Sequence, residues 1–487
     1  MGEPSGVGRL ARYKSIISVL GLIAAGLAFL SVNLFPSINN DGVDYIAYSQ
    51  SLLDHGPVQF GYRQIGYPIL LAVQNALGDL AGIETLLFVT FAQRALLLLA
   101  IAYAIWLWRW RALPLVVLVV APSVVAYTNL IMTEGLTISL VILLSCFTAH
   151  YLMAEEGDGG RVRVGARTVP SETVRTLAVW GATGCALWLL LVRLPWAVFA
   201  LVPLAIWLIS RGHQKLRAPV VALGIYLGSG ALFGISLIVE NQDELGVASP
   251  NARSERAAHW AGWQTTFTLH PENRSDPELR SYYNDGNPYV TIWDIEDANP
   301  VYSDQARLLE AATRDMLETA NLDIGRERFF SFLGALRGGR LDELRPRLET
   351  IIATDASTVD DAIHVNLVSQ TQGRDVFIDT YNEGHKPQAV ITSPLFPRVP
   401  LPYVSTLVAV LLPVSLVGIA VIGWRKERWI EAAMFLVPVL VYSAYLSWFL
   451  ADNVRFLITT GVFAVSGFCL LWAMPPRSAG LATRPSP

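Results

Sequence analysis

Ten apolar runs constrain the fold of this 487-residue chain more than any other feature. A helix needs about 20 mostly apolar residues to cross a bilayer, and only the third, fifth and sixth runs are short for that. The runs cover residues 15–35, 83–107, 112–127, 132–153, 176–192, 196–210, 217–239, 402–423, 430–450 and 454–474. Charged residues make up 16% of the chain, whereas soluble domains carry about 25%. The sequence therefore predicts an all-α polytopic membrane protein with about ten transmembrane helices.

Basic residues occur in every second loop between these runs. They are Arg9, Arg12 and Lys14, then Arg109 and Arg111, then Arg161, Arg163, Arg167 and Arg175, then Arg211, Lys215 and Arg217, and finally Arg425, Lys426 and Arg428. With ten spans, all of these loops fall on one side of the membrane. Because Lys and Arg concentrate in short cytoplasmic loops, we expect both termini in the cytoplasm.

The net charge and the positions of the cysteines argue against a nucleic-acid partner, a cysteine metal site and a disulfide. The net charge of −4 is small and gives no reason to expect a nucleic-acid partner. Cys146, Cys185 and Cys469 lie inside apolar runs and have neither metal-ligand nor disulfide spacing. We therefore interpret them as core or lipid-facing residues.

The predicted spans divide the chain into four parts. They are an N-terminal transmembrane module (1–239) with a first outer loop (36–82), an extracytoplasmic domain (240–400), C-terminal transmembrane helices (401–475) and a cytoplasmic tail (476–487). The 240–400 segment is polar and too long for a plain loop, so we expect a small, mostly helical domain with helices near 303–320 and 324–338. Its His259, Trp260 and Trp263 could stack a sugar ring, or they could form the core of that domain.

The first outer loop carries an acidic and aromatic helical face. Asn and Asp residues near position 40 can cap a helix, and the sequence predicts a helix over 41–53. Residues four apart on a helix share a face, and this face carries Asp41, Asp44, Tyr45, Tyr48 and Leu52. The alternative interpretation is ordinary: acids favour the first turn of a helix, and tyrosines favour membrane interfaces. A second apolar stretch, 61–78, is predicted to lie at the outer interface or to dip into it.

Further charged residues occur on the same side of the predicted membrane. Arg63 lies in the first outer loop, Glu134 begins the 132–153 run, Arg193 separates two runs, and Arg455 begins the last run. Each also has an ordinary interpretation, such as a helix start for Glu134 or an arginine extending to headgroups for Arg193. Together these acids and arginines suit transfer from a lipid-linked phosphate. A carboxylate takes the proton of an attacking hydroxyl, and arginines stabilise the phosphate.

The motifs in these loops resemble those of the GT-C glycosyltransferases, in the branch of the protein O-mannosyltransferases and the lipid A aminoarabinose transferase. The matching first-loop residues are Asp41, Tyr45, Leu52, Leu53, Gly56, Arg63, Gly66, Tyr67 and Pro68. Ile65 replaces the family's Pro, and Gly42 stands where many members have a second acid, so that the second acid here is Asp44. Three further stretches are similar: TEGL with Glu134, VRLP with Arg193, and DNVRFLITTGVF with Arg455. The resemblance covers residues 1–205 and, more loosely, the last spans.

This resemblance implies a fold, a reaction and a set of roles. The family takes sugars from polyprenyl-phosphate or dolichyl-phosphate donors and inverts the anomeric centre. Asp41 would be the catalytic base, with Asp44, Tyr45 and Glu134 near the acceptor or a metal ion. Arg455, with Arg193 or Arg63, would bind the donor phosphate. Some members need a divalent metal and others do not, and the acids here could hold one.

Three functions therefore remain open from the sequence. The first is a glycosyltransferase with its active site on the extracytoplasmic side, whose acceptor is a lipid, a polysaccharide or a protein. Outer loops poor in Lys and Arg, together with few cysteines, fit a bacterial plasma membrane. The second is a transporter or flippase of a lipid-linked glycan, which would need polar residues across the middle of the bilayer. The third is an assembly protein whose 240–400 segment binds a partner.

Overall fold

The computed structural model describes the helical part of this chain. The described residues are 6–31, 37–38, 40–55, 64–83, 85–121, 124–125, 127–128, 131–155, 161–164, 167–193, 196, 198–199, 201–209, 220–221, 224, 307–308, 311, 352–353, 404–449 and 457–476. Most of the predicted span 217–239, most of the 240–400 domain and nearly all of the tail lie outside them. Arg63, Trp260, Trp263 and Arg455 also lie outside the described residues.

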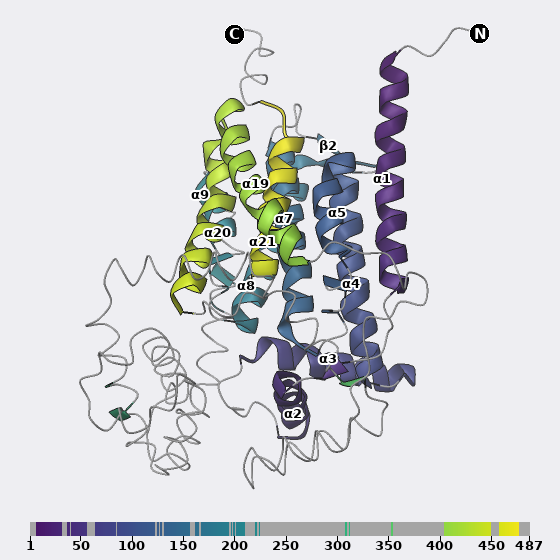
Figure 1. The fold of residues 1–487 in the computed structure, drawn as a ribbon, viewed down its shortest axis with the longest axis vertical. Coiled ribbons are helices and arrows are strands. Elements are labelled where there is room, and N and C mark those ends of the chain that lie inside the picture. Colours follow the sequence, from purple (N-terminus) through teal and green to yellow (C-terminus); the bar gives the residue numbers. More distant parts are fainter. Residues whose placement is uncertain are drawn as a thin grey trace.

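Helices dominate the described part of the chain (Figure 1). They are α1 (Gly6–Ser31), α2 (Asn40–His55), α3 (Gly66–Ala81), α4 (Thr85–Trp108), the 3₁₀ turn η1 (Arg109–Ala112), α5 (Leu113–Val119), α7 (Thr133–Glu155), α8 (Ser171–Val192), α9 (Leu201–Ile209), α19 (Val404–Arg425), α20 (Trp429–Phe449) and α21 (Leu457–Ala473). Most of them run side by side along the long axis of the molecule, whereas α2 and α3 lie at one end, with α3 across that axis. The helices follow the predicted apolar runs, and α2 and α3 follow the two helices predicted for the first outer loop.

Three helical stretches among the described residues are long and apolar enough to cross a membrane. They are Leu86–Val119, Thr133–Ala154 and Ser171–Val192, and shorter apolar helices cover Ile16–Phe29, Val410–Arg425, Trp429–Ala444 and Leu457–Ala473. The predicted helical and apolar character is thereby confirmed, whereas the count of ten spans stays a prediction.

The stretch Leu86–Val119 folds back on itself at η1. Arg109 has a positive φ of 56°, and a Cβ built on Gly21 of α1 would lie 4.0 Å from the side chains of both Ile105 and Val116. Helices α4 and α5 therefore lie side by side at that level, as the separate runs 83–107 and 112–127 predict. The described helix α5 nevertheless ends at Val119, well short of residue 127. Pro122 explains this early end of the helix, because a proline disfavours helical backbone at the residue before it.

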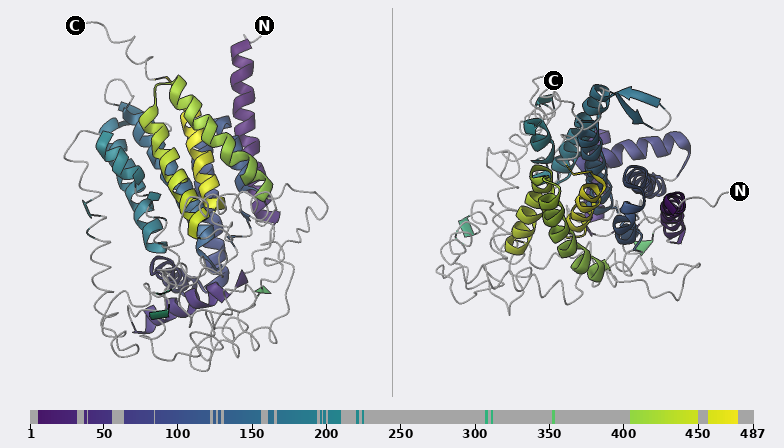
Figure 2. Two further views of the ribbon diagram at one scale, coloured as in Figure 1. Left: turned by 60° about the vertical axis from the view of Figure 1, so that its left-hand side comes forward. Right: turned by 90° about the horizontal axis from the view of Figure 1, so that it is seen from above.

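The two ends of the bundle carry different elements: the basic turns lie at one end, and α2 and α3 lie at the other. Helix α1 begins, and α21 ends, at the end of the molecule where both chain termini are marked (Figure 1). The basic turns at η1 and between α19 and α20 lie at this same end, and Figure 2 shows the arrangement from two further sides. Helices α2 and α3 lie at the opposite end. The alternation of loops therefore agrees with the predicted pattern, while the membrane side of each end stays a prediction.

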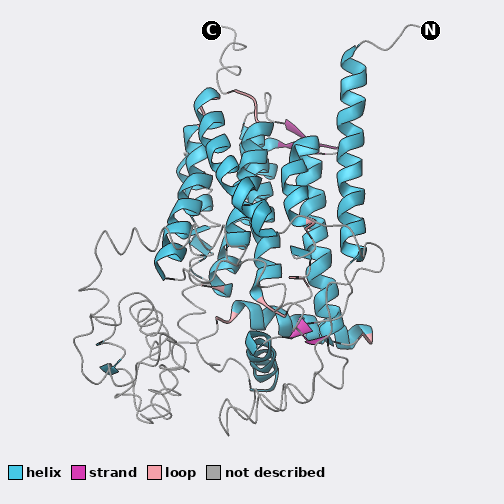
Figure 3. Cartoon of the chain, in the orientation of Figure 1, coloured by secondary structure: helices cyan, strands magenta, loops and turns pink. Residues whose placement is uncertain are grey.

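Two short antiparallel ladders are an exception to the all-α prediction (Figure 3). Strands β2 (Arg161–Val164) and β3 (Arg167–Pro170) form a hairpin between α7 and α8, where Arg and Val alternate in the sequence with the period of a strand. Strand β1 (Ser37–Ile38) pairs with β4 (Ile352–Ala353), with Ser37 opposite Ala353. This second ladder joins the first outer loop to the 240–400 segment, a pairing that local sequence patterns do not predict.

The core of the bundle lies around α7. This helix contacts α4, α8 and α21, and its first residues, including Thr133 and Glu134, are buried. The N-terminal end of α7 lies at the end of the bundle where α3 and α2 lie (Figure 1). The candidate site lies at this end of the bundle, around the start of α7.

Candidate functional site

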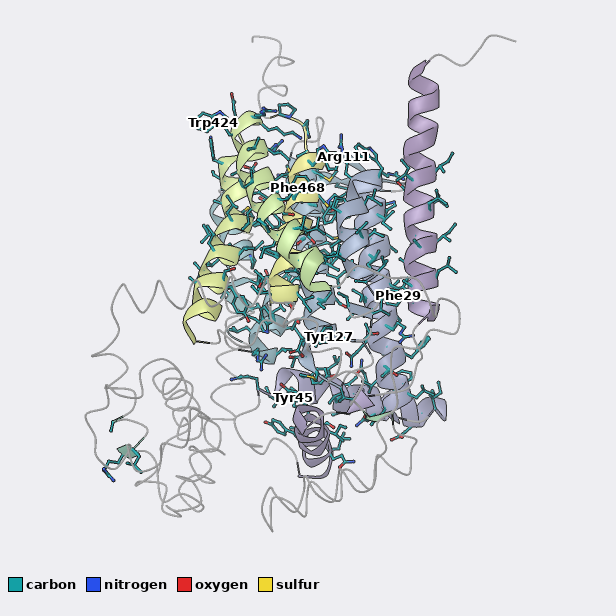
Figure 4. All side chains as sticks on the ribbon, in the orientation of Figure 1. Phe29, Tyr45, Arg111, Tyr127, Trp424 and Phe468 are labelled. Atoms are coloured by element: carbon teal, nitrogen blue, oxygen red, sulfur yellow. The ribbon has the colours of Figure 1, made fainter. Side chains whose placement is uncertain are left out.

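Helix α2 carries the predicted catalytic face of the first outer loop. It begins at Asn40, so that Asp41 and Asp44 lie in its first turns, although their side chains are outside the described residues. Tyr45 and Tyr48 are buried. The ring of Tyr45 meets the ring of Tyr67 edge-on, with centroids 5.0 Å apart and planes at 82°. The face predicted from residue spacing therefore packs Tyr45 against α3, and Figure 4 labels Tyr45 on α2.

Tyr67 of α3 is the centre of a buried polar cluster. Its hydroxyl accepts a hydrogen bond of 2.9 Å from Nε2 of Gln93 on α4. Burial raises the pKa of Tyr67 well above its ordinary value, and the nearby Tyr45 and Glu134 raise it further. The phenol of Tyr67 therefore keeps its proton at neutral pH and remains a hydrogen-bond donor.

Glu134 supplies the carboxylate in the described part of this cluster. It lies in the first turn of α7 and is only 2% exposed. The hydroxyl of Thr133 donates to its Oε2 over 3.3 Å. Glu134 begins the helix, as its ordinary interpretation predicts, and it is close enough to Tyr67 to affect the pKa of that residue. Its role in a functional site stays a prediction.

Gly135 allows α7 to approach α4 and the preceding turn. A Cβ at this position would lie 2.6 Å from the carbonyl oxygen of Tyr127 and 2.8 Å from Oε1 of Gln93. Contacts under 3 Å exclude a larger residue without a shift of the backbone. The glycine after Glu134 therefore keeps Gln93, and with it Tyr67, next to the first turn of α7.

Arg193 lies at the end of α8, next to the start of α3. It is half-buried, and its backbone is extended with φ −162° and ψ 123°. A Cβ on Gly66 would lie 2.6 Å from the carbonyl carbon of Leu191 and 2.8 Å from the amide nitrogen of Val192. The Gly66 and Arg193 motifs, far apart in sequence, are thus in contact through the backbone that precedes Arg193.

The start of α21 also reaches this end of α7. The hydroxyls of Thr137 and Thr459 lie 3.3 Å apart, and Thr459 comes four residues after Arg455 in the sequence. The structure thus brings Tyr45, Glu134 and the segments that adjoin Arg193 and Arg455 to one end of the bundle. Figure 4 shows Tyr45 and Tyr127 at this end.

Sequence reasoning missed two buried polar residues of α4, Gln93 and Arg94. Nη1 of Arg94 donates to the carbonyl oxygen of Phe29 over 2.8 Å, and its Nε donates to Oγ1 of Thr128 over 3.4 Å. Arg94 therefore ties the end of α1 to the turn that precedes α7. The available signal was the pair Gln93–Arg94 inside an otherwise apolar run, because ionisable residues are rare within spans and usually functional.

A divalent metal ion was one expectation for the acids of this site. Among the described residues, no group of three His, Cys, Asp or Glu side chains could hold a metal ion. Glu134 is the carboxylate of the described cluster, and the side chains of Asp41 and Asp44 lie outside the described residues, so a metal ion at this site stays a prediction.

Comparison with known proteins gives two structural similarities. No protein-family model matches the chain, and no curated protein matches it. The crystal structure of ArnT from Cupriavidus metallidurans bound to undecaprenyl phosphate superimposes with a TM-score of 0.35 at 14% identity, over 92% of this chain and 77% of that one. The apo state of the same protein gives a TM-score of 0.30 at 13% identity, over the same shares. Structural similarity at this level does not establish the function of this chain.

Proposed function

We propose that this chain is an integral-membrane glycosyltransferase. It takes a sugar from a polyprenyl-phosphate-linked donor and passes it to an acceptor hydroxyl on the extracytoplasmic side of the plasma membrane. The observation that carries the proposal is the buried cluster of Tyr45, Tyr67, Gln93 and Glu134 at the end of the bundle next to α2 and α3. Buried polar and ionisable groups are costly at a membrane boundary, so such a cluster is best explained by a polar substrate.

Asp41 is the catalytic base in this proposal. The acceptor hydroxyl attacks the anomeric carbon from the face opposite the phosphate, and its proton passes to the carboxylate of Asp41. The bond between the anomeric carbon and the phosphate oxygen breaks, and polyprenyl phosphate leaves, so that the anomeric centre is inverted. Asp41 precedes the buried Tyr45 by about one turn of α2. Asp44 and Glu134 orient the acceptor.

The donor phosphate is bound by arginines in this proposal. Arg193 follows the backbone that Gly66 contacts, and Arg455 precedes the start of α21, where Thr459 lies beside Thr137. Together with Arg63, they neutralise the phosphate when it is bound and when it leaves. Trp260 and Trp263 are assigned to stacking of the sugar ring.

The test is the substitution Asp41→Asn in the full-length protein, assayed in proteoliposomes with a radiolabelled polyprenyl-phosphate sugar. Loss of a general base lowers rates by about 10²–10⁴-fold, and we expect a loss in that range without a change in membrane insertion or unfolding temperature. The matched control is Asp79→Asn, which removes an exposed carboxylate from α3. Near-normal transfer by Asp41→Asn would show that Asp41 is not the base.

A transporter or flippase of a lipid-linked glycan is the second candidate. Arg94 favours it, because this guanidinium is buried within α4 and buried ionisable residues in spans often mark transport pathways. Its bonds to Phe29 and Thr128 suit a fixed connection better than a moving one. Vesicles that accumulate a labelled lipid-linked glycan without any sugar transfer would establish transport and overturn the transferase.

A further inference from the structure

Two neighbouring amide side chains, Gln74 and Asn75, are buried on α3. Each residue is only 8% exposed. Within the part of the chain that the structure describes, neither Oε1 of Gln74 nor Oδ1 of Asn75 has a hydrogen-bond partner. A buried polar atom without a partner is costly, and such atoms are rare in folded proteins. The packing of the helices therefore does not explain why these two positions carry amides.

Gln74 lies on the same buried face of α3 as Tyr67. Seven residues make nearly two turns of a helix, so Gln74 follows Tyr67 on this face about 10 Å further along the axis. Leu71 and Gly78 are buried on the same face, and Asn75 lies beside it. Helix α3 contacts α2, α4 and α8, and it lies at the end of the bundle next to α2 (Figure 1). The two amides therefore extend the polar cluster around Tyr67 along α3.

Amides at these positions suit uncharged hydroxyl groups. A carboxamide has an acceptor oxygen and a donor nitrogen, and a hydroxyl is both donor and acceptor, so a hydroxyl can bond to either end of the amide. Among the buried residues of α3, all of which the structure describes, none is charged. A carboxylate or an ammonium group would therefore be buried here without a counter-charge on this helix, which is costly. A neutral sugar ring supplies several hydroxyls, whereas an isoprenoid chain supplies none.

We propose that Gln74 and Asn75 bind the hydroxyls of a neutral sugar and determine the specificity of the transferase for it. This inference rests on the proposed function, because it takes the cluster around Tyr67 as part of the site of transfer. The sugar belongs either to the polyprenyl-phosphate donor or to the acceptor. The two amides hold the ring by its hydroxyls, and they take no part in the transfer of the proton to Asp41.

The substitutions Gln74→Met and Asn75→Leu test the role of the amides, because each keeps the approximate size of the side chain. Since neither oxygen loses a partner within the described protein, we expect an unchanged or higher unfolding temperature without substrate. The KM for the substrate that carries the sugar should rise about 2- to 10-fold for each lost hydrogen bond, while kcat stays within about twofold of the wild type. The matched control is Thr183→Val, which removes another buried oxygen without a described partner, on α8, and should leave KM unchanged.

The source of the sugar is decided by binding to the full-length protein in nanodiscs, with no acceptor present. The probes are polyprenyl phosphate without a sugar and polyprenyl phosphates that carry glucose, mannose or glucuronic acid. If the sugar belongs to the donor, both variants should weaken the binding of the glucose or mannose compound and leave that of bare polyprenyl phosphate unchanged. If it belongs to the acceptor, all probes should bind as in the wild type, and only the KM for the acceptor should rise.

Two results would overturn the proposal. The first is wild-type probe binding and wild-type KM values in both variants, which would mean that the two oxygens bind water only. The second is a wild-type protein that binds the glucuronic acid compound more tightly than the glucose and mannose compounds, which would exclude a neutral sugar. Binding does not require transfer, so a protein without transferase activity whose amides still discriminate the sugar compounds would refute the proposed function and keep this inference.

Discussion

At the scale of single residues, Tyr67 of α3 connects groups from three other helices. Its hydroxyl is bonded to Gln93 of α4, its ring meets Tyr45 of α2, and Glu134 of α7 is close enough to raise its pKa. Tyr67 is fully buried, so each of these contacts is protected from water. A buried polar group is stabilised by its bonds and becomes costly when one partner is removed.

Tyr67→Phe tests this dependence on one hydrogen bond. We expect it to lower the free energy of unfolding by about 1–3 kcal/mol, because the amide of Gln93 would remain buried without its partner. Gln93→Met should cost a similar amount, and the double variant should cost less than the sum of the two, with a coupling of about 0.5–1.5 kcal/mol. Denaturant unfolding of all four proteins in one detergent measures this cycle. Additive effects would mean that the bond of 2.9 Å contributes nothing to stability.

At the scale of helices, the site depends on how closely α3 approaches the end of α8. Gly66 starts α3, and a side chain there would collide with the backbone of Leu191 and Val192. Backbone atoms inside a packed bundle cannot move aside as a flexible side chain can. The position of Arg193, which follows this backbone, is therefore set by the absence of a side chain at residue 66.

Gly66→Ala is expected to destabilise the protein by about 1–3 kcal/mol, the range for overpacking, and to lower sugar transfer. Gly184→Ala is the matched control, because a Cβ at Gly184 of α8 would meet no atom within 4 Å. Inside a helix that change should be neutral, or stabilising by up to about 1 kcal/mol. Thermal unfolding and transfer assays on both variants decide the point. Equal behaviour of the two variants would contradict the close packing at Gly66.

The sequence predicts elements better than it predicts contacts between them. Apolar runs predict α4, α7 and α8 to within a few residues, and capping and spacing predict α2, because these signals are local. The bonds of Gln93 and Arg94 are not predicted, because Tyr67 and Phe29 lie 26 and 65 residues away in the chain. The β1–β4 ladder is missed for the same reason, since its strands are far apart in sequence and are only two residues long.

At the scale of the whole molecule, the two transmembrane parts of the chain join at the end of α21. Nη1 of Arg111 donates to the carbonyl of Ala473 over 3.0 Å, and Nε of Arg428 donates to the carbonyl of Pro475 over 2.8 Å. Nζ of Lys426 donates to the carbonyls of Leu471, Trp472 and Met474. Cations satisfy the unpaired carbonyls at the end of a helix and suit its negative dipole. We call Arg111, Lys426 and Arg428 the cation clamp.

The predicted sidedness can be measured with cysteines at the two ends of the bundle. Ala81→Cys at the end of α3 and Glu172→Cys at the start of α8 are both exposed positions, and the native cysteines are buried. We expect an impermeant maleimide to label residue 81 in intact cells, and residue 172 only after the membrane is permeabilised. The reverse pattern would invert the topology and would move the proposed site to the cytoplasm.

Within the cation clamp, Arg111 reaches a carbonyl 362 positions away, whereas Lys426 and Arg428 join the turn between α19 and α20 to the end of α21 and the residues that follow it. Burial, together with Arg111 and Arg428, lowers the pKa of Lys426, so the ammonium is held against like charges by the carbonyls of α21. Lys426→Met removes its three bonds, and we expect a loss of about 1 kcal/mol in the free energy of unfolding, since the side chain is partly exposed. Arg425→Gln, at the neighbouring exposed position, should change it by less than about 0.5 kcal/mol. Denaturant unfolding in detergent compares the two variants. A loss for Arg425→Gln as large as that for Lys426→Met would mean that the net charge of the turn, rather than the bonds to α21, stabilises this end of the bundle.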